Sequence, residues 1–236
     1  MSAKTGPGGN GRMEICKGFT VADWRKFRPR LNDDDKQAWS EAIGVFERRM
    51  RERFFRCIDR LLEADCHSLK SEPVVPGFSI TALCCLLVET LQSFWVGGRS
   101  DPQGNPTETC TFPNGKCAKE PSTARAFKDF LSRSRHFSPD FPNSKVRGDF
   151  AVNVRNALLH EAETRGGWLI RRTDPPKHIV EKRDGTYILN RTRLYVALCK
   201  EFVDYLALLR DPSNAERRQH FLKKMDSICQ TEPGIE

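Results

Sequence analysis

The chain has 236 residues, of which 38% are hydrophobic and 30% are charged, and its formal net charge is +8. This length supports one sizeable domain with a real core, and the composition argues against a disordered chain or a membrane-embedded protein. The positive charge favours a polyanionic partner, of which nucleic acid is the commonest, but charge alone does not identify one.

Apolar runs and cysteines predict the compartment. Residues 1–12 lack the apolar segment of a signal peptide. The longest apolar run, residues 80–88, falls short of the roughly 20 residues that a bilayer helix needs. The chain has nine cysteines, an odd number, and Cys84 and Cys85 are adjacent in that run, where thiols behave as small hydrophobes. We therefore expect a reduced, cytoplasmic protein that does not bind a membrane.

In chain order, the first prediction is a flexible tail over residues 1–20, ahead of a helical domain over 21–236. A long helix is expected from about Asp34 to Asp65, because "NDDD" suits a helix start and apolar residues follow at helical spacing. Its opposite face carries Arg48, Arg49, Arg53, Arg56 and Arg60. Most of these arginines are expected to be solvated, and the first four are also candidate contacts to an RNA backbone.

A second helix is expected over residues 78–98, which are apolar nearly all round and therefore central to the fold. Residues 99–122 are rich in Pro and Gly and predict an irregular insertion. Asp184–Gly185 is a hairpin signal within a predicted β-ribbon over 166–190. Further helices are expected at about 123–133, 147–164, 191–210 and 213–229. The predicted fold is mainly α with one small β-hairpin.

One combination of residues has the chemistry of a zinc site. Cys110 and Cys117 lie in the insertion, and Cys66 and His67 end the first long helix. No CxxC or HxxxH pair is present, so the spacing is unlike the common structural zinc motifs. We expect neither a metal nor a cofactor.

Two other chemistries lack their motifs. The segment "GPGGNG" (6–11) is not followed by GK[ST] and so does not form a phosphate loop, and no Gly-x-Ser-x-Gly nucleophile motif is present. These absences, with that of a carboxylate pair for a metal, argue against a nucleotidyl or ADP-ribosyl transfer enzyme.

The stretch "VRNALLHE" (154–161) combines apolar helix positions with Arg155, Asn156 and His160. An apolar stripe that begins at Phe150 fixes one face of this helix in the core. Asn156 and His160 share a second face, and Arg155 is long enough to reach towards His160. A neutral imidazole can accept the proton of a 2′-hydroxyl, and a guanidinium can neutralise a phosphate. The group therefore suits metal-free RNA cleavage, and the alternative is a set of salt bridges beside the core.

The spacing alone is weak evidence, because other Arg–His pairs occur in this chain. Arg60 and His67 stand at a similar interval at the end of the first long helix. Arg172 precedes His178, but two prolines lie between them and exclude a helix.

The segment "FAVNVRNALLHEAETRGGWLI" (150–170) resembles the signature helix of the HEPN superfamily (higher eukaryotes and prokaryotes nucleotide-binding). Its ribonuclease members share R-x4–6-H with a polar residue directly after the arginine, and Arg155, Asn156 and His160 fill these positions. Upstream, "CCLLVETLQSFWVGG" resembles the preceding core helix, with Glu89 as its acidic residue. The resemblance covers roughly residues 40–210 and is most specific around this helix and the motif.

The resemblance implies a HEPN-like α-helical bundle that forms a homodimer through its motif helices. It also implies metal-independent endonuclease attack on single-stranded RNA by the 2′-oxygen, often in a toxin or an antiviral defence effector. His160 is then the general base or acid, Arg155 binds the phosphate, and Asn156 orients the substrate or fixes the motif. Glu89 either orients His160 or Arg155, or forms a purely structural salt bridge to Arg155.

The main alternative is a non-catalytic HEPN module. Such a protein would bind nucleic acid or a partner within a defence or toxin–antitoxin complex without cutting RNA. Cleavage of single-stranded RNA in EDTA separates the two interpretations.

Overall fold

The structure is a computed structural model that describes residues 12–32, 35–67, 76–98, 122–172 and 177–229. The helices are α1 (Val21–Phe27), η2 (Arg28–Arg30), α2 (Lys36–Met50), η3 (Arg51–Phe55), α3 (Arg56–His67), α4 (Gly77–Val96), α5 (Ser122–Arg133), α6 (Ser144–Phe150), η4 (Ala151–Asn156), α7 (Ala157–Glu161), α8 (Arg191–Arg210) and α9 (Ala215–Cys229). The strands are β1 (Glu14–Cys16), β2 (Phe19–Thr20), β3 (Trp168–Arg171), β4 (Val180–Arg183) and β5 (Thr186–Asn190). The prediction of a mainly α fold with a small β component is confirmed.

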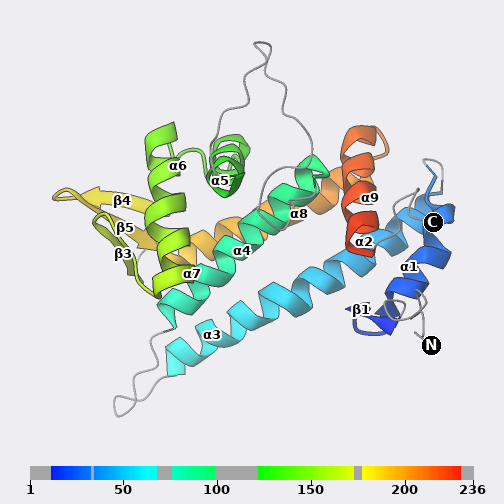
Figure 1. Cartoon of the computed structure of the whole chain (residues 1–236), viewed down its shortest axis with the longest axis horizontal. Helices are drawn as coiled ribbons and strands as arrows, with labels where there is room; N and C mark the ends of the chain where they lie inside the picture. The colour runs from blue at the N-terminus through cyan, green and yellow to red at the C-terminus, as the bar shows by residue number, and fades with distance from the viewer. Residues whose placement is uncertain (1–11, 33–34, 68–75, 99–121, 173–176, 230–236) are drawn as a thin grey trace, which may run out of the picture.

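The apolar helix α4 is the centre of the fold, as predicted. It contacts α3, α5, α8, α9 and β3, and Figure 1 shows it beside the long rod of α2, η3 and α3, with α8 behind it. By length and composition alone α4 is apolar enough to cross a membrane, but half of its apolar window is buried against other elements. Its contacts with these five elements make α4 a core helix of the fold.

Aromatic rings join the central helices into one core. The ring of Phe46 on α2 lies 4.5 Å from that of Phe94 on α4 and 5.7 Å from that of Phe202 on α8. The ring of Phe221 on α9 lies 5.4 Å from that of Phe46. These side chains are almost completely buried. Because each comes from a different helix, their burial fixes how α2, α4, α8 and α9 pack.

The β-ribbon after the motif helix is a three-stranded sheet and not a simple hairpin. The hairpin of β4 and β5 turns at Asp184 (φ 48°) and Gly185 (φ 80°), as the sequence predicted. β3 adds to β5 in parallel, so that the strand order is β3-β5-β4. The prediction missed this parallel pairing because it depends on chain segments that no local turn signal connects.

The N-terminal segment is more structured than the predicted tail. Residues 14–16 and 19–20 form β1 and β2, and Ile15 is only 1% exposed. Thr20 caps α1 through a reciprocal pair of hydrogen bonds with Asp23, and Trp24 then lies fully buried. The tail prediction is therefore wrong for residues 14–20, while residues 1–11 lie outside the described part of the chain.

Some sequence predictions fall on residues that the structure does not describe. The insertion predicted over 99–122 lies outside the described residues except for Ser122, and so do Cys110 and Cys117. The helix α3 includes Cys66 and His67, but their side chains are not described. Within the described residues, no cluster of three or more His, Cys, Asp and Glu side chains has the arrangement of a metal site.

Candidate active site

The motif helix is the continuous run of α6, η4 and α7. The stretch "VRNALLHE" begins in the π-helical turn η4 and ends with α7. Its apolar stripe lies in the core as predicted, with Phe150 and Val154 fully buried. The ring of Phe150 lies 5.3 Å from that of Phe141 and 5.7 Å from that of Trp168. The helix thus packs through Phe150 against the loop after α5 and against β3, and it presents its polar residues from a rigid support.

The helix ends earlier than predicted, at Glu161 and not at residue 164. Ala162 adopts a left-handed conformation with φ of 56°, and the backbone N–H of Arg165 donates to the carbonyl of Asn153 at 2.8 Å. Gly166 follows at φ 61°, where an added Cβ would lie 2.6 Å from the Asn153 amide. This tight return folds the chain against the motif helix before β3 begins.

Arg155 is held in place by two partners. Its Nε donates to Oε1 of Glu89 at 2.5 Å, and a second nitrogen donates to Oε2 at 3.2 Å. A third nitrogen donates to Oδ1 of the neighbouring Asn156 at 3.0 Å. A guanidinium has five N–H donors, so two of them take no part in these three hydrogen bonds. The structure therefore unites three of the predicted site residues in one hydrogen-bonded group.

The ion pair between Arg155 and Glu89 is largely shielded from water. The Arg155 side chain is 15% exposed and that of Glu89 is 28% exposed. Cys85 lies one turn before Glu89, and burial together with the Glu89 charge raises the pKa of its thiol. That thiol therefore stays protonated at neutral pH and is no nucleophile. Partial burial strengthens the pair, which fixes the guanidinium of Arg155 relative to α4.

Arg155 lies within a turn of π-helix. Ala151–Asn156 form a π-helical turn, which adds a residue to the turn and changes the direction of the side chains that follow. Arg155 contacts Glu89 and Asn156, and the expected reach of Arg155 towards His160 is not what the structure shows. Turns of this kind occur frequently at functional sites. No residue type in the sequence marks the position of the π-turn.

His160 lies one turn after Asn156 and is exposed. It makes no hydrogen bond or ion pair with any residue that the structure describes. An imidazole in this position is open to a ligand that approaches from solvent. The arrangement thus offers a fixed guanidinium and amide, with an accessible imidazole one helical turn away.

Exposed apolar side chains flank this polar group. Val152 and Leu159 on the motif helix are 49% and 38% exposed, and Leu86, one turn before Glu89 on α4, is 37% exposed. Contiguous apolar patches of this kind mark surfaces that pair with a partner, whereas single exposed apolar side chains are ordinary.

The predicted RNA-binding arginines of the first long helix divide into two groups. Arg49 and Arg53 both donate to backbone carbonyls of β1, and burial together with the charge of Arg53 lowers the pKa of Arg49 to about 10. These two side chains therefore fasten β1 to the helix. Arg53 is exposed in spite of its contact with β1, and Arg48 and Arg56 are exposed too, so that an RNA contact of Arg48 and Arg56 stays a prediction.

The competing Arg–His pairs have other partners. Arg60 forms an exposed ion pair with Glu63 at 3.4 Å. Arg172 pairs with Asp65 at 3.5 Å, while Nδ1 of His178 is hydrogen-bonded to Oδ1 of Asp140, which accepts, at 2.9 Å. Neither pair resembles the group around Arg155.

Comparison with protein-family models, with curated proteins and with solved structures finds no match for the chain. The functional argument therefore depends on the geometry of the site and on the motif.

Proposed function

We propose that the protein is a metal-independent endoribonuclease that cleaves single-stranded RNA. The observation that supports this proposal is the fixed Arg155–Asn156 pair on a rigid helix, with the accessible imidazole of His160 one turn further on. These groups can supply the general base and the phosphate-binding donors for RNA cleavage by an internal nucleophile.

In this mechanism the 2′-oxygen of the RNA attacks the adjacent phosphorus, and the bond to the 5′-oxygen breaks. His160 in its neutral form accepts the 2′-hydroxyl proton. The two remaining N–H donors of Arg155 and the Asn156 amide bind the non-bridging oxygens, where negative charge develops. The departing 5′-oxygen takes a proton, and the products are a 2′,3′-cyclic phosphate and a 5′-hydroxyl end.

A homodimer supplies the group that one chain lacks. One imidazole accepts the proton of the 2′-hydroxyl, so a second, protonated group must donate a proton to the departing 5′-oxygen. A two-fold axis next to the motif helices brings the His160 of a second chain into the same cleft for this role. The exposed Val152, Leu159 and Leu86 give the motif face the apolar contacts that such an interface needs.

Glu89 acts on Arg155 by holding its orientation. The carboxylate balances the guanidinium charge, so the Arg155–Glu89 pair as a whole has no net charge. The pair therefore contributes to cleavage through the orientation of the N–H donors of Arg155. The same ion pair favours the alternative function, a non-catalytic HEPN module in which the pair stabilises the bundle and RNA or a protein partner binds without being cut.

The biological setting follows from the resemblance to HEPN ribonucleases. We propose a cytoplasmic toxin or antiviral defence effector, with an antitoxin or a defence-complex subunit as its partner.

A gel assay with labelled single-stranded RNA in EDTA tests the proposal. The ribonuclease cuts the RNA under these conditions and leaves cyclic phosphate ends. A shifted but intact RNA band would identify the binding module. Cleavage that is lost in EDTA and restored by Mg²⁺ or Mn²⁺ would contradict the mechanism.

A further inference from the structure

A second amide on the motif helix lies outside the hydrogen-bonded group of Arg155. Asn153 stands three residues before Asn156 and seven before His160. Seven residues are about two helical turns, so the side chains of Asn153 and His160 leave the helix on the same side. The Oδ1 atom of Asn156 accepts a hydrogen bond from Arg155, whereas the Asn153 side chain bonds to no residue that the structure describes. Its donor and its acceptor are therefore both free.

The return of the chain after the motif helix holds this amide in place. A Cβ added at Gly166 would lie 2.6, 2.8 and 3.1 Å from Nδ2, Cγ and Oδ1 of Asn153. Because the three distances are similar, Gly166 stands over the flat face of the amide and not against its hydrogen-bonding edge. The backbone N–H of Arg165 donates to the carbonyl of Asn153 at 2.8 Å, which fastens the return to the same residue. The half-buried amide thus has one face covered and its polar edge uncovered.

The charges around Asn153 favour a neutral ligand. Both neighbouring guanidiniums are already paired, that of Arg155 with Glu89 and that of Arg165 with Glu161. Asp149, one turn before Asn153, and Glu163 in the return carry negative charge and form no ion pair with a residue that the structure describes. Two unbalanced carboxylates disfavour a phosphate beside the Asn153 amide and leave a neutral, hydrogen-bonding group as the better match.

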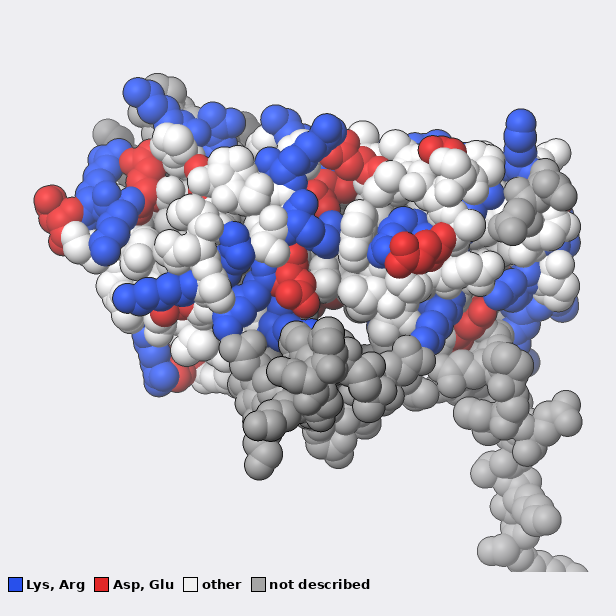
Figure 2. Space-filling model, turned by 90° about the horizontal axis from the view of Figure 1, so that it is seen from above, with Lys and Arg blue, Asp and Glu red and all other residues white. Residues whose placement is uncertain are grey.

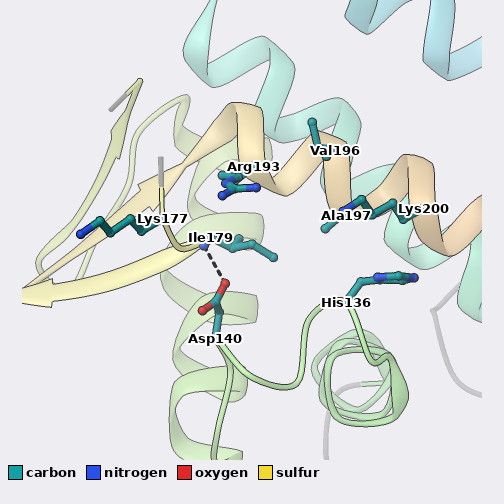
Figure 3. A pocket seen from close by; sticks show the side chains of 8 residues that line it. All are labelled: His136, Asp140, Lys177, Ile179, Arg193, Val196, Ala197 and Lys200. Atoms are coloured by element: carbon teal, nitrogen blue, oxygen red, sulfur yellow. Dashed lines mark hydrogen bonds between the residues drawn. The ribbon is translucent and has the colours of Figure 1, made fainter. Parts of the chain in front are cut away.

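The phosphates of a bound strand have basic side chains elsewhere to contact. Lysines and arginines gather over the end of the molecule that carries the sheet (Figure 2). Lys177 and Lys200 are exposed at an open cavity between the loop after α5, β4 and α8, and they extend to opposite sides of it (Figure 3). The neutral part of a nucleic acid strand is its bases, so the amide is suited to a base.

A carboxamide presents one donor and one acceptor side by side. Adenine has the complementary pair on one edge, where N7 accepts and the N6 amino group donates, and asparagine commonly binds this edge with two hydrogen bonds. Sequence-specific recognition of RNA is directed mainly at single strands, whose unstacked bases expose such edges. Asn153 lies about 10 Å from His160 along the helix axis, a span of about three stacked nucleotides.

We propose that Asn153 recognises an adenine base of the RNA strand, with Nδ2 donating to N7 and Oδ1 accepting from the N6 amino group. The inference rests on the proposed RNA substrate and gives the site a base preference close to the cleaved bond. It concerns binding, so its test does not require cleavage.

Fluorescence anisotropy with a labelled 2′-O-methyl oligoadenylate tests the contact, because this strand has no free 2′-hydroxyl and cannot be cleaved. The matched ligand contains 7-deazaadenine at every position, which replaces N7 by carbon and removes only that acceptor. The parent protein should bind the 7-deaza strand about fivefold more weakly, the lower end of the discrimination that a bidentate contact gives.

Two variants assign this difference to Asn153. Asn153→Ala has no amide, and the nearly isosteric Asn153→Asp has no donor for N7, so each should bind the two strands equally. The melting temperature of each variant reports that it is folded. Gln219→Ala removes an exposed amide from α9, at the other end of the molecule from the motif helix, and should keep the fivefold difference (Figure 1).

Equal binding of the two strands by the parent protein would overturn the proposal, and so would a failure to bind either strand. A fivefold difference that persists in both Asn153 variants would also overturn it, because another group would then contact N7. Loss of the difference in these variants supports the base contact. If such a protein leaves unmodified RNA intact in EDTA, the base contact stands and the proposed ribonuclease fails.

Discussion

Replacement of Glu89 by alanine will leave the guanidinium of Arg155 without its main partner. The change removes hydrogen bonds of 2.5 Å and 3.2 Å from a side chain that is 15% exposed. Loss of one member of a fully buried pair costs about 3–5 kcal/mol. Because Glu89 is 28% exposed and water can replace part of the interaction, we expect the free energy of unfolding to fall by about 2 kcal/mol.

A double-mutant cycle measures the pair itself. Urea denaturation of the parent, Glu89→Ala, Arg155→Ala and the double variant should give a coupling energy of about 1–2 kcal/mol. The matched control is the cycle on Arg60 and Glu63, whose side chains are 83% and 60% exposed and whose coupling should be close to zero. If the two cycles give equal coupling, the shielded ion pair does not hold Arg155 in place, and the argument for a fixed guanidinium fails.

Three further predictions concern RNA binding, assembly and the turn after the motif helix. Arg48→Glu combined with Arg56→Glu should weaken RNA binding and reduce the slope of log affinity against log salt by about 1.4, the value for two phosphate contacts to a single strand; an unchanged slope would mean that both are simply solvated. Val152→Asp, at a 49% exposed position, should convert the dimer into a monomer, measured by sedimentation at micromolar concentration, and should reduce the cleavage rate. A parent protein that is monomeric and still cuts RNA would contradict the dimer. Gly166→Ala should lower the free energy of unfolding by at least about 1 kcal/mol, because φ is 61° and the new Cβ would meet the Asn153 side chain; a neutral result in urea denaturation would show that the turn is free to relax.

Local patterns predicted the main helices well. The helix expected at 191–210 has these bounds in the structure, and the apolar run around Cys84 forms the core of α4 as its composition indicated. Asp184–Gly185 marked a true hairpin turn. These elements depend on residues close in sequence, so periodicity and turn chemistry are enough to find them.

Features that depend on distant residues or on fine helix geometry were missed. The parallel pairing of β3 with β5 and the docking of β1 on Arg49 join segments that no local signal connects. The π-turn at Ala151–Asn156 has no marker in residue type. The capping pair of Thr20 and Asp23 is a local sequence signal for the start of α1, a helix that was not predicted.

Of the contacts expected around the motif, the salt bridge between Glu89 and Arg155 is present, whereas the reach of Arg155 towards His160 is not. The sequence allowed either His160 or Arg155 as the partner of Glu89, and the structure pairs Glu89 with Arg155 across 66 positions of the chain. A motif gives spacing along one helix, whereas the direction of a long side chain depends on the charge that a neighbouring helix presents.

The most direct test of the proposed ribonuclease is the cleavage rate of His160→Ala in EDTA, measured together with its melting temperature. His160 is exposed and bonded to no residue that the structure describes, so its loss should leave the melting temperature nearly unchanged. The cleavage rate should fall by about a hundredfold or more, the usual weight of general acid–base catalysis, whereas His67→Ala should cut at the parent rate. A folded His160→Ala variant that cleaves RNA as fast as the parent would contradict the catalytic assignment.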